Sequence, residues 1–298
     1  MWVSLAFLSA LMLGLYDVAK KRSLKDNAVL PVLWLNTLFS SIIFLPSLLD
    51  SAFGGGWLDG SLLETTSGTL HDHARVFLKA VMVLSSWIFG YFGIKHLPLT
   101  IVGPINATRP VLTLCGAMLI FGERLNGYQW VGVVLAIVSL YLLSRSSKKE
   151  GVDFAHNRWI LCVAAAAIIG VGCGLYDRHI MFSMNAVFVQ SWYTLYQFLL
   201  MTIIVAILWL PKRHEQKFHW SWAIPMISIL LTAGDMAYLH ALRDNAAMIA
   251  VVAMIRRSSV VVSFACGAVL FGERNLKAKA LDLLLILIGM IFLYIGSR

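Results

Sequence analysis

Charged residues are scarce in this chain: they make up 13% of its 298 residues, against 59% hydrophobic residues. The mean hydropathy of +0.80 excludes an ordinary water-soluble domain. The apolar stretches also lack the alternation of polar and apolar residues that is typical of strands in a transmembrane barrel. The sequence therefore predicts an all-α polytopic membrane protein.

Cysteines are few and catalytic motifs are missing. All 4 cysteines lie inside apolar stretches without metal-ligand spacing, so we interpret them as small buried residues and expect no metal site. No nucleophile elbow, zinc-protease motif or P-loop occurs, so we predict neither an enzyme nor a cofactor. The first apolar stretch follows no basic region, so we expect it to be part of the fold and not a removable signal. The cysteines are Cys115, Cys162, Cys173 and Cys266.

Apolar stretches long enough to cross a bilayer, which takes roughly 20 helical residues, recur along the whole chain. Because their Leu, Ile and Val residues do not alternate with polar ones, helices are favoured over strands. We predict ten transmembrane helices, near residues 2–19, 28–49, 76–93, 99–120, 128–144, 159–176, 186–210, 221–240, 246–271 and 278–296.

Short sequence motifs return in the same order in the two halves of the chain. Ordered matches of this kind indicate an internal repeat, here residues 1–145 and 158–298. Five spans per repeat would insert the second copy from the opposite side of the membrane, and such inverted repeats are a recurring build of secondary transporters. The matches are Gly14-Leu15-Tyr16-Asp17 with Gly174-Leu175-Tyr176-Asp177, Asn27-Ala28-Val29 with Asn185-Ala186-Val187, and Phe121-Gly122-Glu123-Arg124 with Phe271-Gly272-Glu273-Arg274.

The doubled pattern resembles the ten-helix EamA-type branch of the drug/metabolite transporter superfamily. In the first copy a polar helix with Asn106, Arg109 and Pro110 leads to Gly122-Glu123-Arg124 and a glycine-bearing last helix. The second copy repeats the pattern over residues 256–289, with Val260 at the counterpart of Pro110. The resemblance implies carriers of small metabolites that work by alternating access. It also implies that the first four helices of each half surround the cavity while the fifth is peripheral.

The orientation in the membrane stays open between two alternatives. Most Lys and Arg residues lie in loops that follow odd-numbered spans, and this bias favours both termini outside the cell. The family resemblance implies cytoplasmic termini instead. The net charge of +9 is spread over these loops, so we expect no nucleic-acid partner. The expected partners are a small-molecule substrate and the lipid bilayer of a cell membrane, with the bacterial inner membrane as the predicted location.

Polar side chains at helical spacing indicate which helix faces line a path through the protein. Asn106, Arg109 and Thr113 follow an i, i+3, i+7 pattern, and Arg256, Ser259 and Ser263 repeat it at the equivalent positions of the second copy. Polar atoms that face lipid are costly, so a duplicated polar stripe favours a shared cavity. The candidate cavity residues are Trp34, Asn36, Trp87, Tyr91, Asn106, Arg109, Trp192, Tyr193, Gln197, Asp235, Arg256 and Arg257.

Charged residues inside the predicted spans are the most informative about the cavity, because placing an Arg at the bilayer centre costs at least ~2.5–3.5 kcal/mol on insertion scales. Arg109, Arg256 and Arg257 therefore favour a substrate that bears a carboxylate or phosphate, or a zwitterion. Asp235 is the candidate coupling-proton site, or an Arg partner. Asp17 and Asp177 occupy equivalent positions near helix ends, and the expectation for both is interfacial snorkelling.

The predicted function is a secondary active transporter that moves a small metabolite by alternating access. A channel and a non-transporting membrane sensor are the alternatives, because the sequence has no signature that separates a continuous pore from an alternating one. Two membrane aspartates are also typical of intramembrane aspartyl proteases, which need paired carboxylates. Asp17 and Asp177 are expected towards opposite faces of the membrane, which argues against that activity.

Overall fold

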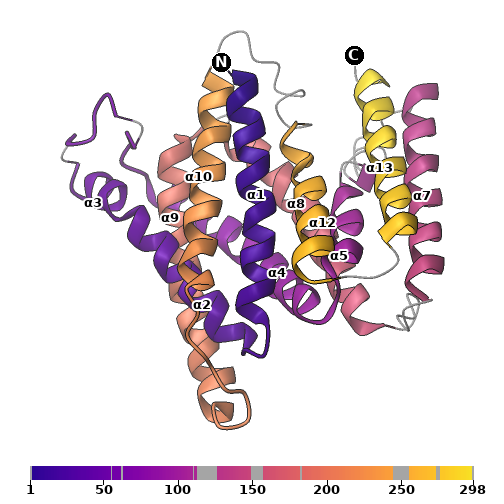
Figure 1. Ribbon diagram of the computed structural model, residues 1–298. Helices are drawn as coiled ribbons and strands as arrows, with labels where there is room; N and C mark the ends of the chain where they lie inside the picture. The colour runs from indigo at the N-terminus through magenta and orange to yellow at the C-terminus, as the bar shows by residue number, and fades with distance from the viewer. Residues whose placement is uncertain are drawn as a thin grey trace.

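A computed structural model describes residues 2–54, 56–61, 63–109, 111–112, 126–148, 157–181, 183–243, 255–272 and 276–296. Within these ranges the chain is helical throughout and has no strand, as the sequence predicts (Figure 1). The helices are α1 (Trp2–Leu24), α2 (Val29–Ile43), α3 (Leu45–Phe53), α4 (Leu70–His96), α5 (Leu99–Ala107), α7 (Gly127–Lys148), α8 (Arg158–Met181), α9 (Ala186–Ile204), the short turns η1 (Val205–Trp209) and η2 (Leu210–Lys212), α10 (Ala223–Arg243), α12 (Ser259–Leu270) and α13 (Leu276–Gly296).

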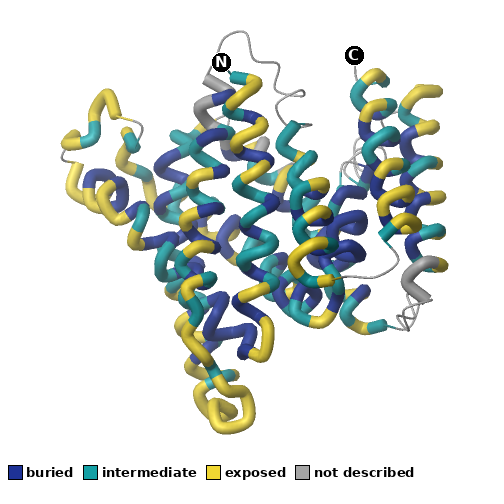
Figure 2. The backbone as a smooth tube through the Cα atoms, viewed as in Figure 1, coloured by how far each residue is buried: buried dark blue, intermediate teal, exposed yellow. Residues whose placement is uncertain are grey.

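The apolar helices make this a polytopic membrane protein. Among the described residues, five helices are long and apolar enough to cross a membrane, or six if the bent pair α2 and α3 is one span. Two shorter apolar helices cover Arg158–Gly174 and Ala223–Tyr238. The predicted spans 99–120 and 246–271 are only partly described, so the count of ten is not confirmed. Figure 2 shows exposed residues along the outer helix faces, and many are large and apolar, including Phe7, Ile137, Ile168 and Ile203.

The predicted span 28–49 is broken into two helices. The chain bends by 57° between α2 and α3. Pro46 lies in the first turn of α3 and has no N–H to continue the hydrogen-bond ladder of α2. The following connection is ordered by side-chain hydrogen bonds: the Trp57 N–H donates to Asp50 Oδ1 at 2.8 Å, and Ser51 Oγ donates to the Thr66 carbonyl at 2.7 Å.

Helix ends follow local capping chemistry. Thr69 and Asp72 form a capping box that starts α4 at Leu70, six residues before the predicted start at 76. The Asn185 side chain accepts from the Val187 and Phe188 N–H groups at the start of α9. Gly272, in the second copy of the repeated motif, has a φ of 60° directly after the end of α12, the left-handed conformation in which helices commonly terminate. The first copy, Phe121-Gly122-Glu123-Arg124, lies outside the described residues.

The contacts between helices follow the sequence repeat. When both helices of a contacting pair are replaced by their counterparts in the other half, the result is another contacting pair (the two pairs exchange) or the same pair. The counterparts are α1 with α8, α2 with α9, α4 with α10, α5 with α12 and α7 with α13. The closest pairs are α1 with α10 and α4 with α8, which exchange, and α7 with α13, which maps onto itself. The pair α1 with α12 exchanges with α5 and α8, and the pair α4 with α9 exchanges with α2 and α10, while α2 with α9 and α5 with α12 map onto themselves. A two-fold relation between residues 1–145 and 158–298 predicts this pairing.

The two ends of the bundle are identified by hydrogen bonds between helix termini. At one end, called the Lys21 end, Lys21 Nζ donates to the carbonyls of Ile94 and Leu97 at 2.7 and 2.6 Å, so the ends of α1 and α4 meet. At the other, called the Arg75 end, Arg75 near the start of α4 donates to Ser183 Oγ, after α8, at 3.2 Å. Helix α8 is thus antiparallel to α4 and to α1 (Figure 1).

We expect Gly132→Val in α7 to destabilise the protein, because α7 and α13 pack through their glycines. A Cβ at Gly132 would lie 2.7 Å from Leu293 Cδ2 and 2.8 Å from the Gly289 carbonyl oxygen, and a backbone atom cannot move aside cheaply. Overpacking of this kind costs roughly 1–3 kcal/mol. The measurement is the midpoint of thermal unfolding in detergent. Gly127→Val is the matched control, since a Cβ there meets nothing within 4 Å. Equal midpoints for both variants would contradict the prediction.

Candidate functional site

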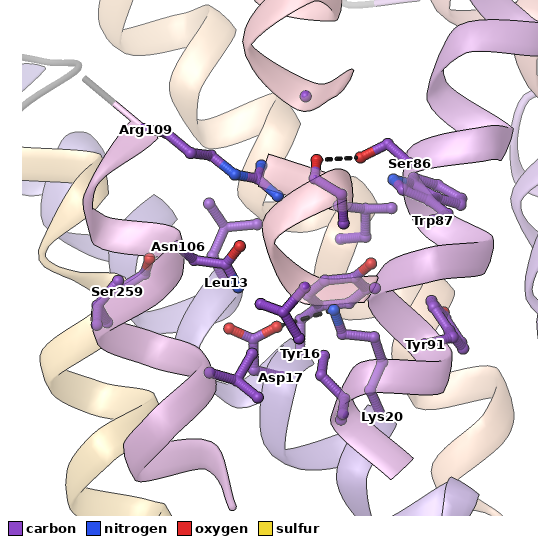
Figure 3. A pocket seen from close by; sticks show the side chains of 18 of the residues that line it. Leu13, Tyr16, Asp17, Lys20, Ser86, Trp87, Tyr91, Asn106, Arg109 and Ser259 are labelled. Carbon is purple, nitrogen blue, oxygen red and sulfur yellow. Dashed lines mark hydrogen bonds and ion pairs between the residues drawn. The ribbon is translucent and has the colours of Figure 1, made fainter. Parts of the chain in front are cut away.

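A cavity of about 270 Å³ lies inside the bundle (Figure 3). Its wall comes from α1, α4, α5 and the residues after it, α8, α10 and the residues around the start of α12. Among the described residues, α7 and α13 contribute no wall residue, in agreement with the peripheral position that the family resemblance implies for the fifth helix of each half. Helices α2 and α9 contribute none either, whereas the resemblance implies that the second helix of each half also surrounds the cavity. The wall residues are Leu13, Tyr16, Asp17, Lys20, Val83, Ser86, Trp87, Gly90, Tyr91, Ile94, Val102, Asn106, Arg109, Val163, Ala166, Gly170, Cys173, Leu231, Arg257, Ser259 and Val260.

An ion pair on α1 forms the part of the wall nearest the Lys21 end. Lys20 Nζ lies 2.9 Å from Asp17 Oδ1, one helical turn away on the same face. The same ammonium lies 4.1 Å from the centre of the Tyr16 ring and 5.4 Å from that of Tyr91. A cation over an aromatic face is stabilised by the ring quadrupole. Lys20 is therefore held by one carboxylate and two aromatic rings, and its positive charge is largely balanced within the wall.

Arg109 reaches the cavity from about the middle of the bundle. It lies ten residues beyond the start of α5 at the Lys21 end, or about 15 Å at 1.5 Å per helical residue. This is close to half of the roughly 30 Å hydrocarbon core. The guanidinium lies against α8 at Gly170, where an added Cβ would be 3.1 Å from Arg109 Cζ. Gly170 thus leaves the room that the guanidinium occupies.

Arg257 reaches the same cavity from the other half of the chain. It lies two residues before α12, the helix that packs on α5, and it is exposed although it belongs to the wall of an internal cavity. A guanidinium inside a helix bundle faces a partner, water or a ligand, since lipid would not solvate it. Arg109 and Arg257 therefore bring positive charge to one cavity from opposite halves.

Five of the twelve candidate residues lie in the wall of this cavity: Trp87, Tyr91, Asn106, Arg109 and Arg257. The buried Tyr91 hydroxyl and the Asn106 Oδ1 have no hydrogen-bond partner among the described residues. Thr113, the last member of the first polar stripe, lies outside the described residues.

Two other candidates, Asp235 and Arg256, pair with each other on the Arg75 side of the cavity. The Asp235 carboxylate accepts a hydrogen bond from the Arg256 guanidinium, and Gln190 Nε2 donates to its second oxygen at 3.4 Å. The guanidinium lies 4.4 Å from the centre of the Tyr238 ring. Neither residue belongs to the cavity wall. Pairing with an arginine was one of the two roles predicted for Asp235, and Asp235 has this pairing in the structure.

A second Asp–Lys pair lies on the same side. Lys79 Nζ of α4 is 2.9 Å from Asp177 Oδ1 of α8 and 4.8 Å from the centre of the ring of Tyr193, another candidate residue. Asp177 is the repeat counterpart of Asp17, and the two lie towards opposite ends of the bundle, as the sequence predicts. In this conformation they do not form the carboxylate pair that an aspartyl protease requires. Each of the two carboxylates is paired with a lysine.

The remaining candidates lie away from the cavity. Trp34 Nε1 donates to Thr202 Oγ1 at 2.8 Å in an apolar groove on the outside of α2 and α9. Asn36 is buried and accepts from Ser228 Oγ at 2.9 Å. Trp192 Nε1 donates to Ser51 Oγ at 3.0 Å. The fourth, Gln197, is 1% exposed and faces neighbours inside the bundle. These four residues thus contact neighbouring helices or the outer groove.

Sequence reasoning missed Tyr16, Lys20 and Gly170. Lys20 was assigned to the first loop because the predicted span ended at residue 19, whereas α1 continues to Leu24. The signal was present: Tyr16, Asp17 and Lys20 follow an i, i+1, i+4 spacing that places an acid and an aromatic ring beside the lysine. Gly170 carries no signal of its own, since its role is to leave space.

Metal binding has no support in the described part of the chain, where no group of three or more His, Cys, Asp or Glu residues lies together. The described cysteines Cys162, Cys173 and Cys266 are free thiols.

Comparison with known proteins identifies the first half of the chain. Residues 1–145 match the EamA-like transporter family, whose members are membrane transporters of small substrates. No curated protein is significantly similar to the chain in sequence. A solved crystal structure of a protein shares the fold, with a TM-score of 0.62 and 16% sequence identity over 100% of this chain and 98% of that chain. At this identity the likeness concerns the fold alone.

We expect Asp235→Ala to lower stability more than the double variant Asp235→Ala/Arg256→Ala. The single change leaves the Arg256 guanidinium without its carboxylate in a partly buried position, which costs more than removing both charges. A coupling free energy of about 1–3 kcal/mol is expected between the two positions. A double-mutant cycle on thermal or denaturant unfolding in detergent measures it. Additive effects of the two single changes would rule out a stabilising pair.

Proposed function

Since residues 1–145 form an EamA-like transporter domain, we propose that the chain is a secondary active transporter. It moves a small carboxylate-bearing or zwitterionic metabolite across a cell membrane, the inner membrane of a bacterium, by alternating access. The carrying observation is the charged cavity in the middle of the bundle, bounded on its Arg75 side by paired charges. Its location inside the bundle and its small size are typical of a substrate site in a carrier.

The proposal includes two inverted halves, residues 1–145 and 158–298. Its support is the exchange of helix pairs between counterparts and the opposite directions of α1 and α8. Arg109 and Arg257 then belong to counterpart segments, so each half contributes one guanidinium to the shared cavity. In carriers built this way, one half rocks against the other around a fixed site.

In this conformation the cavity extends towards the Lys21 end. Its wall includes Lys20 and Ile94, which are close to the ends of α1 and α4. On the Arg75 side, the Lys79–Asp177 pair joins α4 of the first half to α8 of the second. Asp17 instead pairs with Lys20 of its own helix and joins no two helices. This difference supports a state in which an ion pair joins the two halves on the Arg75 side of the cavity.

Asp235 remains the proposed coupling-proton site. Protonation of its carboxylate would remove the charge that attracts Arg256, and so would loosen α10 from the segment before α12. The side chains of Asp235 and Arg256 are 18% and 24% exposed, so water has access to the pair. A proton gradient could then supply the energy, in keeping with the lack of a nucleotide-binding motif in the sequence.

A channel and a non-transporting sensor are the competing functions. A continuous pore needs an open path at both ends, whereas two ion pairs lie between the cavity and the Arg75 end. This arrangement favours a carrier. A sensor would bind ligand in the same cavity without transport, so flux measurements separate it from the other two.

We expect saturable counterflow in proteoliposomes that are preloaded with alanine, succinate or glycerol 3-phosphate and exposed to the labelled compound. Arg109→Gln should lower the initial rate at least tenfold, because it removes a charge from the cavity. Arg145→Gln, on the exposed face of α7, is the matched control and should leave the rate unchanged. Linear, unsaturable flux would favour a channel. Binding of a probe without any flux would favour a sensor.

A further inference from the structure

A second hollow, the outer groove, lies on the outside of the bundle between α2 and the end of α9. Its volume is about 380 Å³, and no described residue belongs both to its wall and to the wall of the central cavity. One side of the groove comes from residues 1–145 and the other from residues 158–298, so a ligand there would touch both parts of the sequence repeat. The wall residues are Pro31, Trp34, Leu35, Thr202, Val205, Ala206, Trp209, Leu210, Phe218 and Trp220.

The polar groups in this wall are mostly used within the protein. Thr202 Oγ1 accepts a hydrogen bond from Trp34 Nε1 at 2.8 Å and donates its own to the Phe198 carbonyl at 2.8 Å. Trp209 Nε1 donates to the Gln216 carbonyl at 3.0 Å. The surface left to a ligand is therefore hydrocarbon and aromatic ring. An acyl chain gains dispersion contacts with such a surface, whereas a polar ligand would lose its hydrogen bonds.

The outer groove lies near the level of the lipid headgroups at the Lys21 end. The span Ala186–Lys212 has 27 residues. At 1.5 Å per helical residue it is about 40 Å long, which exceeds the hydrocarbon core of roughly 30 Å. The last turns of this span form the groove, and the connection that follows them extends beyond the other helices (Figure 1). Trp220 and Trp222 there are 50% and 78% exposed, as is typical of the aromatic belt of a membrane protein.

A π-helical turn forms part of the groove wall. Val205–Trp209 make up this turn, and the Leu210 N–H bonds to the Val205 carbonyl five residues earlier. Turns of this kind are rare and frequently occur at functional sites. Val205, Ala206 and Trp209 all belong to the wall, and Ala206 is exposed. The helix thus departs from α geometry where it faces the groove.

A basic segment borders the groove on its headgroup side. Residues 211–217 connect Leu210 to Phe218, which are both wall residues, and all seven are exposed (Figure 2). At neutral pH the segment has three cations and one acid. Cations at the level of the headgroups attract anionic lipids by about 1 kcal/mol per Lys or Arg. The charged residues are Lys212, Arg213, Lys217 and Glu215.

Hydrogen bonds hold the basic segment at the rim of the groove. The bond from Trp209 Nε1 to the Gln216 carbonyl joins the segment to the wall. Just after the segment, Asn27 Nδ2 donates to the His219 carbonyl at 2.7 Å, and Asn27 Oδ1 accepts from the His219 N–H at 3.0 Å. Asn27 lies directly before α2, so both sides of the groove restrain the chain that carries the cations.

Another apolar pocket, on the Arg75 side, provides a comparison within the same protein. It has a volume of about 360 Å³ and lies between the end of α2 and the connection after α3. Residues 45–69 contain three acids, Asp50, Asp59 and Glu64, and no Lys, Arg or His. The two hollows have similar volumes and apolar walls, but the neighbouring charges have opposite sign. Of the two, the outer groove suits an anionic lipid. The wall residues of the other pocket are Ile42, Leu45, Pro46, Leu49, Trp57 and Leu58.

We propose that the outer groove binds an anionic phospholipid. One acyl chain lies along the wall between α2 and the π-helical turn, and the headgroup phosphate lies at Lys212, Arg213 and Lys217. A zwitterionic phospholipid would contact the same wall, but it has no net charge for the basic segment to attract. The site is separate from the central cavity and does not depend on the proposed transport function.

The test is retention of lipid by the purified full-length protein in detergent, measured by native mass spectrometry. The probes are dioleoylphosphatidylglycerol and dioleoylphosphatidylcholine at equal concentration, since they share acyl chains and differ in net charge. We expect at least fivefold higher retention of the phosphatidylglycerol, with a preference that falls as salt is raised. Equal retention of the two lipids would overturn the proposal. Displacement of the phosphatidylglycerol by glycerol 3-phosphate would indicate a site for a free phosphate and would overturn it too.

Charge variants locate the headgroup. Lys212→Gln/Arg213→Gln should lower phosphatidylglycerol retention at least fivefold and leave phosphatidylcholine retention unchanged. Arg145→Gln/Lys277→Gln is the matched control, because it removes the same charge from exposed positions of α7 and α13 outside the groove wall. Full phosphatidylglycerol retention in the first variant, or an equal loss in the control, would contradict the assignment.

A groove variant locates the acyl chain. Ala206→Trp places a large ring at an exposed wall position and should lower retention of both lipids at least threefold, whereas Ala278→Trp, at an exposed position of α13, should not. Unchanged retention in Ala206→Trp would overturn the proposal. If that variant instead converts a dimer into a monomer with lipid retention unchanged, the groove is a contact between copies of this chain.

These outcomes are independent of transport. Preference for phosphatidylglycerol that depends on Lys212 and Arg213, without counterflow of any substrate, would retain the lipid site and reject the carrier. Saturable counterflow, with equal retention of the two lipids, would retain the carrier and reject the lipid site.

Discussion

The cost of an unpaired charge in hydrocarbon is the constraint on which this structure depends. Asp17, Asp177 and Asp235 lie within membrane helices, and each is paired with a cation. Each of these cations also lies within 5 Å of the centre of an aromatic ring, Lys20 with Tyr16, Lys79 with Tyr193 and Arg256 with Tyr238. Beyond these pairs, the described part of the cavity wall contains Arg109 and Arg257. A charged group at this depth needs a partner, water or a ligand to solvate it.

The two halves satisfy the same constraint with different residues. Asp17 and Asp177 are counterparts in the repeat, and each has a lysine at 2.9 Å. Lys20 is on the same helix as its acid, whereas Lys79 is on a neighbouring helix of the other half. A pair within one helix restrains no movement between helices, while a pair between α4 and α8 does. The duplicated acid therefore has different mechanical consequences at the two ends, which would allow one end to be closed while the other is accessible.

Most of the fold could be predicted from the sequence, because apolar length and the absence of alternation determine membrane helices directly. The break between α2 and α3 was missed, although Pro46 marked it, because hydropathy averages over a turn. The site was harder. Sequence spacing predicts depth and helix face, and Arg109 and Asn106, which this spacing selected, lie in the cavity wall. It could not decide which of two adjacent arginines faces the cavity: Arg257 does, while Arg256 turns to Asp235.

The choice between Arg256 and Arg257 depends on long-range packing, since one helical step rotates a side chain by about 100°. Under the proposed mechanism, the fact that Arg257 and not Arg256 faces the cavity has a consequence for coupling. Arg257 and Arg109 belong to opposite halves, so closing the halves around an empty cavity brings like charges together. A bound carboxylate between the two arginines would turn that repulsion into attraction on both sides. Closure would then be favoured when the cavity is loaded and opposed when it is empty, and a carrier with this property exchanges substrates faster than it returns empty.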